Sequence, residues 1–326
     1  MRSTLYGRTV QVVFCSMALI GAGVAHAQNW PAKPIRLISP FPPGGAVDLM
    51  SRAIAVKLDS LGQSVIVENK PGANGIIGID ACAKADGDGH TFCLTNNDSV
   101  TFNAFLFRKL PFNPRTDLAT VAHAGFIEGL IVGYPGAVGS MKEALERVRA
   151  KPNSLSLGSF GPGSIGHLYA EWLAKEAGAR FIHVPFKGAG PALQAVMSGE
   201  VSVAFSGVGA ILPFAKVGKL KPLVVSGDRR SAFLPDTPTF RELGVEFSIR
   251  PWLGIFAPKS VPAEIVQRVN AQVNRAAKED PKFHERWYTE QAIEFWPNTP
   301  AQFAEFFLKD LQDAATLVKI AGVTLD

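Results

Sequence analysis

Short runs of apolar or β-branched residues alternate along the chain with longer amphipathic runs. The short runs are bounded by Gly, Pro, Asn and Asp, as strands typically are, and the longer runs have helical spacing. Ser140 and Glu143, for example, form a capping box that predicts a helix running to Ala150. This alternation indicates an α/β fold with mainly parallel sheets. The expected strands lie at residues 34–39, 64–68, 90–95, 130–134, 154–157, 181–184, 201–205, 221–225 and 253–256.

The pattern changes after Pro262, where helical periodicity continues without glycine-rich turns. Helices are expected at 263–278 and 281–292, and a last one begins at Thr299. A chain of 326 residues is long for a single core, so two lobes are expected. We expect the C-terminal helices to pack as a cover on one of them.

Residues 1–27 have the pattern of a secretory signal peptide. Two arginines precede an apolar run at 10–24, and Ala25-His26-Ala27 provides a small-residue cleavage site. The sequence therefore predicts cleavage after Ala27 and a mature protein in the periplasm. No other stretch approaches the roughly 18 consecutive apolar residues that a membrane-spanning helix needs.

Charge excludes one class of partner. The chain carries 33 Lys and Arg against 28 Asp and Glu, for a net charge of +5. The bias is weak and evenly spread, so no nucleic-acid partner is expected.

Two cysteines, Cys82 and Cys93, remain after the expected signal peptide. In an oxidising compartment two cysteines usually pair, and an expected helix and the following strand could bring these two together, so a disulfide is predicted. The alternative is a zinc site that includes His90. It is disfavoured because His90 and Cys93 would point to opposite faces of a strand and no fourth ligand is evident. Neither a metal nor a cofactor is expected.

The stretch SPFPPGGAVD, residues 39–48, joins an expected strand to an expected helix. Its two glycines would let the backbone approach a ligand closely, and the start of a helix favours an anion. The alternative is a tight turn in which the prolines fix φ. Glycine-rich turns also follow strands at 69–78, 158–167 and 185–191, and all four could face one cleft.

The third of these turns contains the glycine spacing of dinucleotide-binding loops, at Gly161, Gly163 and Gly166. Such a loop needs an acidic residue about 20 positions later to hold the ribose. The chain has no acid at 184–187, where that residue would lie. The turn therefore does not predict NAD binding.

Hydrolase chemistry finds equally little support. Ser159 follows Leu157-Gly158 and lacks the spaced glycine of a G-x-S-x-G elbow. His167 could face Ser159 or Ser164, so an exported serine hydrolase that uses Ser159 and His167 stays as an alternative. No paired carboxylates and no P-loop lysine are evident. The sequence offers groups that bind and no clear reactive group.

Five stretches, in this order and spacing, carry a resemblance to a known family: WPAKPIRLISPFPPGGAVD, VIVENKPGANGIIG, KADGDGHTF, HVPFKGAGPAL and LPDTPTFRELG. The chain resembles the Bug family of extracytoplasmic solute receptors, the substrate-binding proteins of tripartite tricarboxylate transporters, from Trp30 nearly to its C-terminus. The resemblance implies a two-lobe periplasmic binding protein of type II (Venus flytrap) that closes on a carboxylate-bearing ligand in the cleft between its lobes. It also implies a monomer that is not an enzyme, with the membrane subunits of a transporter as partners. A sensor that reports its ligand to a signalling partner is the variant of this function.

In such receptors the chain crosses twice between the lobes, which we place near Phe126 and Arg250. Lobe one would then comprise 28–126 and 251–326, and lobe two 127–250. By their motifs, the ligand-binding residues implied for lobe one are Pro43, Gly44, Gly45, Asp48, Asn74, Gly75, Thr95 and Asn96. Those implied for lobe two are Ser159, Gly163, Ser164, Phe186, Lys187, Gly188 and Ser206.

The roles of three of these positions, and of Phe160 beside them, are open to more than one interpretation. Asp48 is an acid in an expected anion site, and near the start of its helix it either contacts the ligand or braces the turn. Phe186 replaces the family's usual tyrosine, Phe160 a small polar residue and Ser206 a common aspartate. In the cleft, these three changes would favour a flat apolar acid over a ligand with an ammonium group. The alternative is that the three side chains point away from the cleft.

Overall fold

The structure is a computed structural model that describes residues 30–245 and 250–325. The expected signal peptide and its cleavage site lie outside the described residues. Within the described ranges, no helix is both long and apolar enough to cross a membrane.

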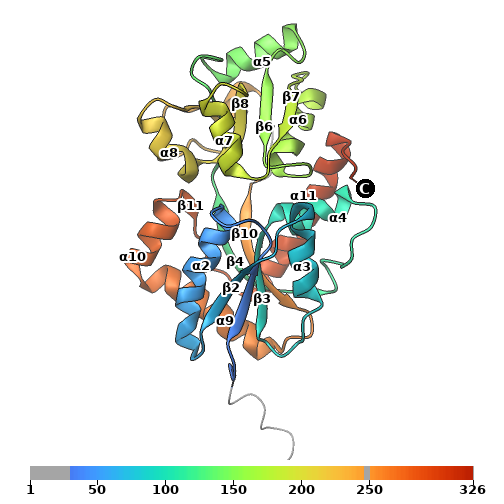
Figure 1. The fold of residues 1–326 in the computed structure, drawn as a ribbon, viewed down its shortest axis with the longest axis vertical. Helices are drawn as coiled ribbons and strands as arrows, with labels where there is room; N and C mark the ends of the chain where they lie inside the picture. The colour runs from blue at the N-terminus through green and yellow to red at the C-terminus, as the bar shows by residue number, and fades with distance from the viewer. Residues whose placement is uncertain (1–29, 246–249, 326) are drawn as a thin grey trace, which may run out of the picture.

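A six-stranded sheet forms the first of two lobes, the lower one in Figure 1, here called lobe one. Its strands follow the order β11-β4-β10-β3-β1-β2. β1 pairs in parallel with β2 and β3, whereas β10 runs antiparallel to β3 and β4. The strands are β1 (Ile35–Ser39), β2 (Val65–Asn69), β3 (Thr91–Asn96), β4 (Leu118–Ile127), β10 (Trp252–Pro258) and β11 (Ile293–Glu294).

A five-stranded sheet forms lobe two, with the order β7-β6-β8-β5-β9. β6 pairs in parallel with β7 and β8, and β5 runs antiparallel to β8 and β9. The expected parallel pairing is thus confirmed for three strands in each lobe, while β4, β5, β9 and β10, next to the two passages between the sheets, have antiparallel neighbours. The strands are β5 (Gly129–Gly133), β6 (Ser156–Ser159), β7 (Ile182–Pro185), β8 (Val203–Gly207) and β9 (Lys221–Val225).

Helices cover both sheets (Figure 1). Those that follow the strands of lobe one are α2 (Ala46–Leu58), α3 (Ile76–Ala83), α4 (Asn103–Leu106), α9 (Ala263–Glu279), α10 (Pro281–His284) and α11 (Pro300–Ala321). Those of lobe two are α5 (Met141–Ala150), α6 (Ile165–Glu176), α7 (Ala189–Met197) and α8 (Val208–Lys216). Single turns of other helix types are η1 (Asp59–Leu61), η2 (Ala73–Gly75), η3 (Asp98–Phe102), η4 (Arg241–Leu243) and η5 (Glu285–Thr289).

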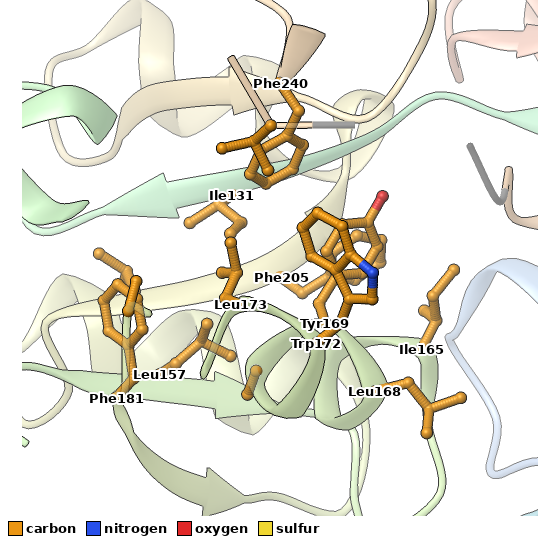
Figure 2. Packing of buried hydrophobic residues seen from close by; sticks show 14 of the residues in the cluster. Ile131, Leu157, Ile165, Leu168, Tyr169, Trp172, Leu173, Phe181, Phe205 and Phe240 are labelled. Carbon is orange, nitrogen blue, oxygen red and sulfur yellow. The ribbon is translucent and has the colours of Figure 1, made fainter. Parts of the chain in front are cut away.

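The core of lobe two forms around α6. Its Tyr169 ring stacks on Phe205 of β8 with centroids 5.1 Å apart, and on Phe240 at 5.5 Å (Figure 2). Stacked aromatic rings of this kind contribute both buried area and specific geometry. α6 is thereby fixed on the sheet, with its N-terminus at the end of β6.

α11 contacts both lobes, which differs from the expected cover on one lobe. Near its start, Phe303 packs against Trp252 of β10 at 5.7 Å between ring centroids. Near its end, Leu317 and Val318 belong to the same buried cluster as α6 residues. A helix of 22 residues is about 33 Å long and can therefore extend past the edge of one lobe.

The other differences concern element boundaries. The helix expected at 281–292 ends as an α-helix at His284 and continues as the π-turn η5 and the short strand β11. β4 and α8 were not expected. The last helix begins as predicted, because Thr299 and Gln302 form a complete capping box.

The predicted disulfide is absent from the structure. Cys82 on α3 and Cys93 on β3 are both fully buried, and both are free thiols. Burial and, second, the neighbouring Cys82 thiol raise the pKa of Cys93 well above its usual value. Helix and strand thus bring the thiols together as expected, but each packs as a small apolar side chain.

The disfavoured zinc site has no counterpart either. His90 accepts a hydrogen bond from the Ala32 N–H at 3.2 Å. In the described part of the chain, no three His, Cys, Asp or Glu residues are grouped so that they could hold a metal ion.

Because the two thiols are free and buried, an alkylating reagent should leave Cys82 and Cys93 unmodified in the native protein without its leader. After unfolding in urea without reductant, intact mass should show two adducts. A matched sample treated with reductant gives the count for fully free thiols. Two adducts only in the reduced sample would show that the residues form a disulfide after all.

Candidate functional site

The loop between β1 and α2 ends in two glycines with different constraints. Gly44 has φ +90°, a left-handed conformation that favours glycine. Gly45 is the N-cap of α2 with φ −83° and no side-chain cap. A Cβ atom at Gly45 would meet nothing within 4 Å, so the start of α2 borders open space.

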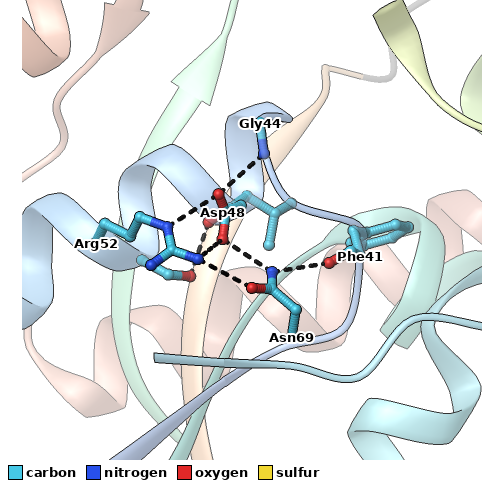
Figure 3. A network of polar contacts seen from close by, with 7 residues as sticks. Phe41, Gly44, Asp48, Arg52 and Asn69 are labelled. Carbon is cyan, nitrogen blue, oxygen red and sulfur yellow. Dashed lines mark hydrogen bonds and ion pairs between the residues drawn. The ribbon is translucent and has the colours of Figure 1, made fainter. Parts of the chain in front are cut away.

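Asp48 holds this loop in place (Figure 3). Its Oδ2 accepts a hydrogen bond from the Gly44 N–H at 2.9 Å, and its Oδ1 accepts one from Asn69 Nδ2 at 2.8 Å. Arg52, one turn along α2, pairs with Oδ1 at 2.9 Å. Asn69 Nδ2 also donates to the Phe41 carbonyl at 3.0 Å. The carboxylate therefore ties the loop, the helix and the end of β2 together.

Of the two roles considered for Asp48, this network favours bracing of the turn over contact with a ligand. The side chain is only 3% exposed. Burial opposes ionisation, but the bonds from Arg52, the Gly44 N–H and Asn69 outweigh it, and the pKa of Asp48 lies below its usual value. Asp48 braces the turn, and the Gly44 N–H is already occupied. The N–H groups of the first turn of α2, beyond Gly45, are those left for an anion.

The loop before α3 has positive φ at four consecutive residues, 72–75, among them Asn74 with φ 51° and Gly75 with φ 89°. Asn74 Nδ2 donates to Asn103 Oδ1 at 2.9 Å, and Asn103 Nδ2 returns a bond to the Asn74 carbonyl at 3.0 Å. A side chain at Gly75 would overlap Ser99. Gly75 is therefore required by packing, and Asn74 is fixed by Asn103.

Buried polar atoms without a hydrogen-bond partner gather at the carboxyl ends of β1 and β3. Ser39 ends β1, and Thr95 lies near the end of β3, with Asn97 and Asp98 just after it. Each is at most 3% exposed, and each has an oxygen that no described residue bonds. Such atoms are costly unless a polar partner reaches them. This end of the sheet is therefore suited to a polar ligand or to water.

In lobe two, a serine and two histidines support the loop after β6. Ser159 Oγ lies 2.6 Å from His183 Nε2 on β7. His183 stacks on His167 with ring centroids 4.2 Å apart, and His167 Nδ1 accepts the Gly163 N–H at 3.1 Å. Burial and, second, the stacked ring lower the pKa of His183 to about 4, and burial also lowers the pKa of His167. Both rings are therefore neutral at pH 7.

This arrangement does not favour the alternative of a hydrolase. His167 bonds the Gly163 N–H, and the histidine paired with Ser159 is His183. Ser159 is 0% exposed and shares its hydroxyl with the Gly161 carbonyl. A buried hydroxyl held inside its own loop is a structural support for that loop.

The remaining candidates of lobe two lie around the ends of β7 and β8. The Phe186 N–H donates to the Ser159 carbonyl at 2.9 Å, so the 185–188 turn is joined to the loop after β6. Lys187 is exposed, and Gly188 caps α7. Phe160 and Phe186 pack on different buried clusters and so do not form one aromatic pair. Ser206 is buried in β8, and its hydroxyl donates to the Gly207 carbonyl at 3.4 Å.

The two lobes are in contact where the loop before α3, in lobe one, meets the loop after β6 (residues 160–164, here called the β6 loop), in lobe two. A Cβ atom at Gly163 would lie 3.2 Å from both Asn74 Nδ2 and Leu106 Cδ1. Asp98 of η3 lies against the N–H of Ile165, the first residue of α6. The structure thus brings Asn74 and Gly163, two of the predicted site residues, together across the lobes.

A separate cavity lies on lobe two, away from the predicted site residues. It has a volume of about 620 Å³ and is lined by Tyr134, Gln194 and Lys219, among others. Gly133 of β5 pairs with Val203 at the start of β8, whereas Ser159 lies at the end of β6, which runs parallel to β8. The cavity therefore lies at the opposite end of these strands from Ser159. It contains none of the predicted site residues, and ligands of open α/β sheets bind at the carboxyl ends of strands.

Comparison with known proteins identifies the type of receptor. The model of the tripartite tricarboxylate transporter family receptor matches residues 50–323. The chain belongs to this family. Among its relatives, BugT of Bordetella pertussis is 33% identical over 317 residues, which cover 96% of each chain.

Solved structures agree with the assignment to this receptor family. The periplasmic binding protein BugD has a TM-score of 0.80 at 28% identity, over 90% of this chain and 99% of BugD. MatC of Rhodopseudomonas palustris with bound malate has a TM-score of 0.81 at 28% identity, over 89% of this chain and all of MatC. Another R. palustris protein, with adipate, has a TM-score of 0.84 at 27% identity, over 90% and 99%. The chain is a solute-binding receptor with the two-lobe fold of periplasmic binding proteins.

Several residues of the candidate site were not singled out from the sequence. Asp98, Asn103 and His183 carry contacts as central as those of the predicted residues. A signal was present for Asp98, because it lies in the run of polar residues at 95–99 that ends a buried strand. His183 gave no such signal, since its role depends on the stacking of α6 on β7.

Replacing Asp48 with alanine should lower the free energy of unfolding by about 1–3 kcal/mol, because Asn69 and the Gly44 N–H lose a buried acceptor. Urea unfolding followed by circular dichroism measures the change. Asp313→Ala, which removes an exposed carboxylate paired with Lys309, is the control and should change stability by less than about 0.5 kcal/mol. Equal effects of the two substitutions would contradict the bracing role.

The lowered pKa of His183 predicts a pH dependence. Between the ordinary value of 6.5 and the folded value of about 4, the unfolded chain binds more protons, so this residue makes stability fall as pH falls. Asp98, whose pKa burial raises to about 7, acts in the opposite direction, so the comparison is made with a variant. His183→Gln should show a smaller loss of unfolding free energy from pH 6.5 to 4 than the wild type. Parallel curves for the two proteins would contradict this assignment.

Proposed function

We propose that this receptor captures a small carboxylate-bearing ligand between its lobes and delivers it to the membrane subunits of a tripartite tricarboxylate transporter. It would act in the periplasm as a monomer, after cleavage behind Ala27. The malate and adipate bound to MatC and to the second R. palustris protein support a carboxylate as the ligand class.

One observation carries the proposal. The N-terminus of α2 at Gly45 is open, and it lies at the carboxyl end of the strands in the sheet of lobe one. At the same end are buried oxygens that no described residue bonds, those of Ser39, Thr95 and Asn97. A carboxylate there would meet the free N–H groups of the first turn and the positive end of the helix dipole. Hydroxyl and amide groups could bind it directly or through ordered water.

Lobe two would contact the rest of the ligand through the β6 loop and the 185–188 turn. These two segments are already joined by the bond between Phe186 and Ser159, so they form one surface. Lys187 is an exposed cation on that surface. Closure of the lobes would then require that both ends of the ligand are bound.

In this proposal the ligand leaves unchanged. Neither Ser159 nor His167 takes part in a reaction, because each is committed to holding the β6 loop. Delivery to a signalling partner in place of a transporter would use the same cleft and the same closure.

Gly45→Val tests the site, because a side chain at this position has room in the structure and would enter the space in front of α2. Isothermal titration with mono-, di- and tricarboxylates, aromatic acids and amino acids should show binding to the wild type. The valine variant should bind the best of these at least about tenfold more weakly, since it excludes an anion from the helix start. Gly44 is a poorer test, because its positive φ would strain any side chain.

Ala271→Val, on the exposed side of α9, is the control for an added apolar side chain. It should leave both folding and affinity unchanged. If Gly45→Val folds normally and retains wild-type affinity, the loop is only a turn and the proposed carboxylate site is wrong.

A further inference from the structure

α2 and α6 each begin after the carboxyl end of a strand, β1 and β6 respectively, and their N-termini differ in charge. The first turn of α2 contains Asp48, but Arg52 pairs with this carboxylate, and both belong to the same helix. α6 has no acid in its first turn, and its N-cap Ser164 makes no side-chain cap. Each N-terminus would favour an anion if nothing else were nearby.

An acid from the opposite lobe lies at the start of α6. Asp98, on η3 of lobe one, lies against the Ile165 N–H and the Asn96 side chain, and both favour its ionised form. Asp98 is 3% exposed, and its Oδ1 has no hydrogen-bond partner among the described residues. No cation is among the groups that act on its pKa. A buried carboxylate without a cation partner thus lies against a helix N-terminus.

This position corresponds to the place of a ligand anion. In lobe one, the site proposed above is the open N-terminus of α2, and the equivalent position in lobe two is the N-terminus of α6, after Ser164. Asp98 puts one carboxylate there from within the protein. A second carboxylate, on the ligand, would compete for the same N–H groups and would be repelled by the charge of Asp98.

We propose that Asp98 takes the place of a second ligand carboxylate at the N-terminus of α6, so that the cleft selects small monocarboxylates over dicarboxylates. This inference rests on the proposed function and adds the ligand class. In it, the carboxylate of the ligand binds at α2, and its other end, near Asp98, carries no negative charge.

Matched ligands of equal chain length test this selection. Hexanoate, adipate and 6-aminohexanoate differ only at the far end of a six-carbon chain, and butyrate, succinate and 4-aminobutyrate form a shorter set. Isothermal titration at pH 8, above the pKa of about 7 that burial gives Asp98, compares them under conditions where this carboxylate is ionised. Where a set of ligands binds the wild type, its monocarboxylate should have an affinity at least about tenfold higher than its dicarboxylate.

Asp98→Asn keeps the shape and an acceptor for the Ile165 N–H while it removes the charge. It should raise dicarboxylate affinity about tenfold relative to the monocarboxylate. Asp310→Asn is the matched control, because Asp310 is also buried, but on α11, where it lies beside Thr101 and Trp252. The control should leave the preference as it is in the wild type.

Three results would overturn the assignment of Asp98 alone. They are a wild type that binds the dicarboxylate as tightly as the monocarboxylate, an Asp98→Asn variant with an unchanged preference, and a wild type that binds the amino acids tightest. The last result would make Asp98 a receptor for an ammonium group. If Asp98→Asn does not fold, the wild-type comparison decides. If no ligand of either set and no carboxylate of the wider panel binds the wild type, the proposed function fails, and this inference with it.

Discussion

The packing of α11 across both lobes constrains everything else in this receptor. The chain passes between the sheets from β4 to β5 and from β9 to β10, and α11 adds a third connection by burying one half in each lobe. A motion that separates the lobes at α6 must also separate α6 from the last turns of α11, or carry α11 along. The apolar contacts of Leu317 and Val318 therefore favour rotation about this side over a simple parting of the lobes.

The buried polar groups of lobe one are of two kinds: some have hydrogen-bond partners within the protein, and others have none among the described residues. Asp48, Asn69 and Arg52 satisfy one another and hold the first loop rigid. The oxygens of Thr95 and Asn97, by contrast, are buried with no described partner. Such atoms destabilise the folded protein. Because they lie at the carboxyl ends of the strands of one sheet, a polar ligand bound there would give them hydrogen-bond partners and offset this destabilisation. Rigid loops and unsatisfied buried atoms are the features that a preorganised binding site would have, as the proposed function requires.

The sequence predicted the two-lobe α/β fold well because strands, helices and caps are local patterns. Thr299 and Gln302 form the expected capping box, and the parallel strands have the expected order of alternation. The split of one expected helix at His284 was not predictable, since η5 and β11 depend on pairing with β4. The packing of α11 on both lobes was also missed, because the sequence shows that the helix has an apolar face but not which surfaces this face contacts.

The candidate site, like the fold, was predictable from the sequence only in part. Glycine-rich turns after strands indicated where loops gather, and Asn74 and Gly163 do meet across the lobes. What could not be read from the sequence is which polar groups are already used inside the protein. The Gly44 N–H is occupied by Asp48, His183 supports Ser159, and only three-dimensional packing decides such partnerships.

The position of Leu325 has a practical consequence. Its N–H donates to the Leu106 carbonyl at 2.7 Å, and its side chain lies close to Gly163. Any peptide joined behind this residue would emerge beside the meeting of the lobes. Trp30, in contrast, donates its Nε1–H to the carbonyl of Gly89 just before β3, so it lies at the opposite end of the strands from the candidate site. Fluorescent reporters and purification tags therefore belong before Trp30, where they leave the movement of the lobes free.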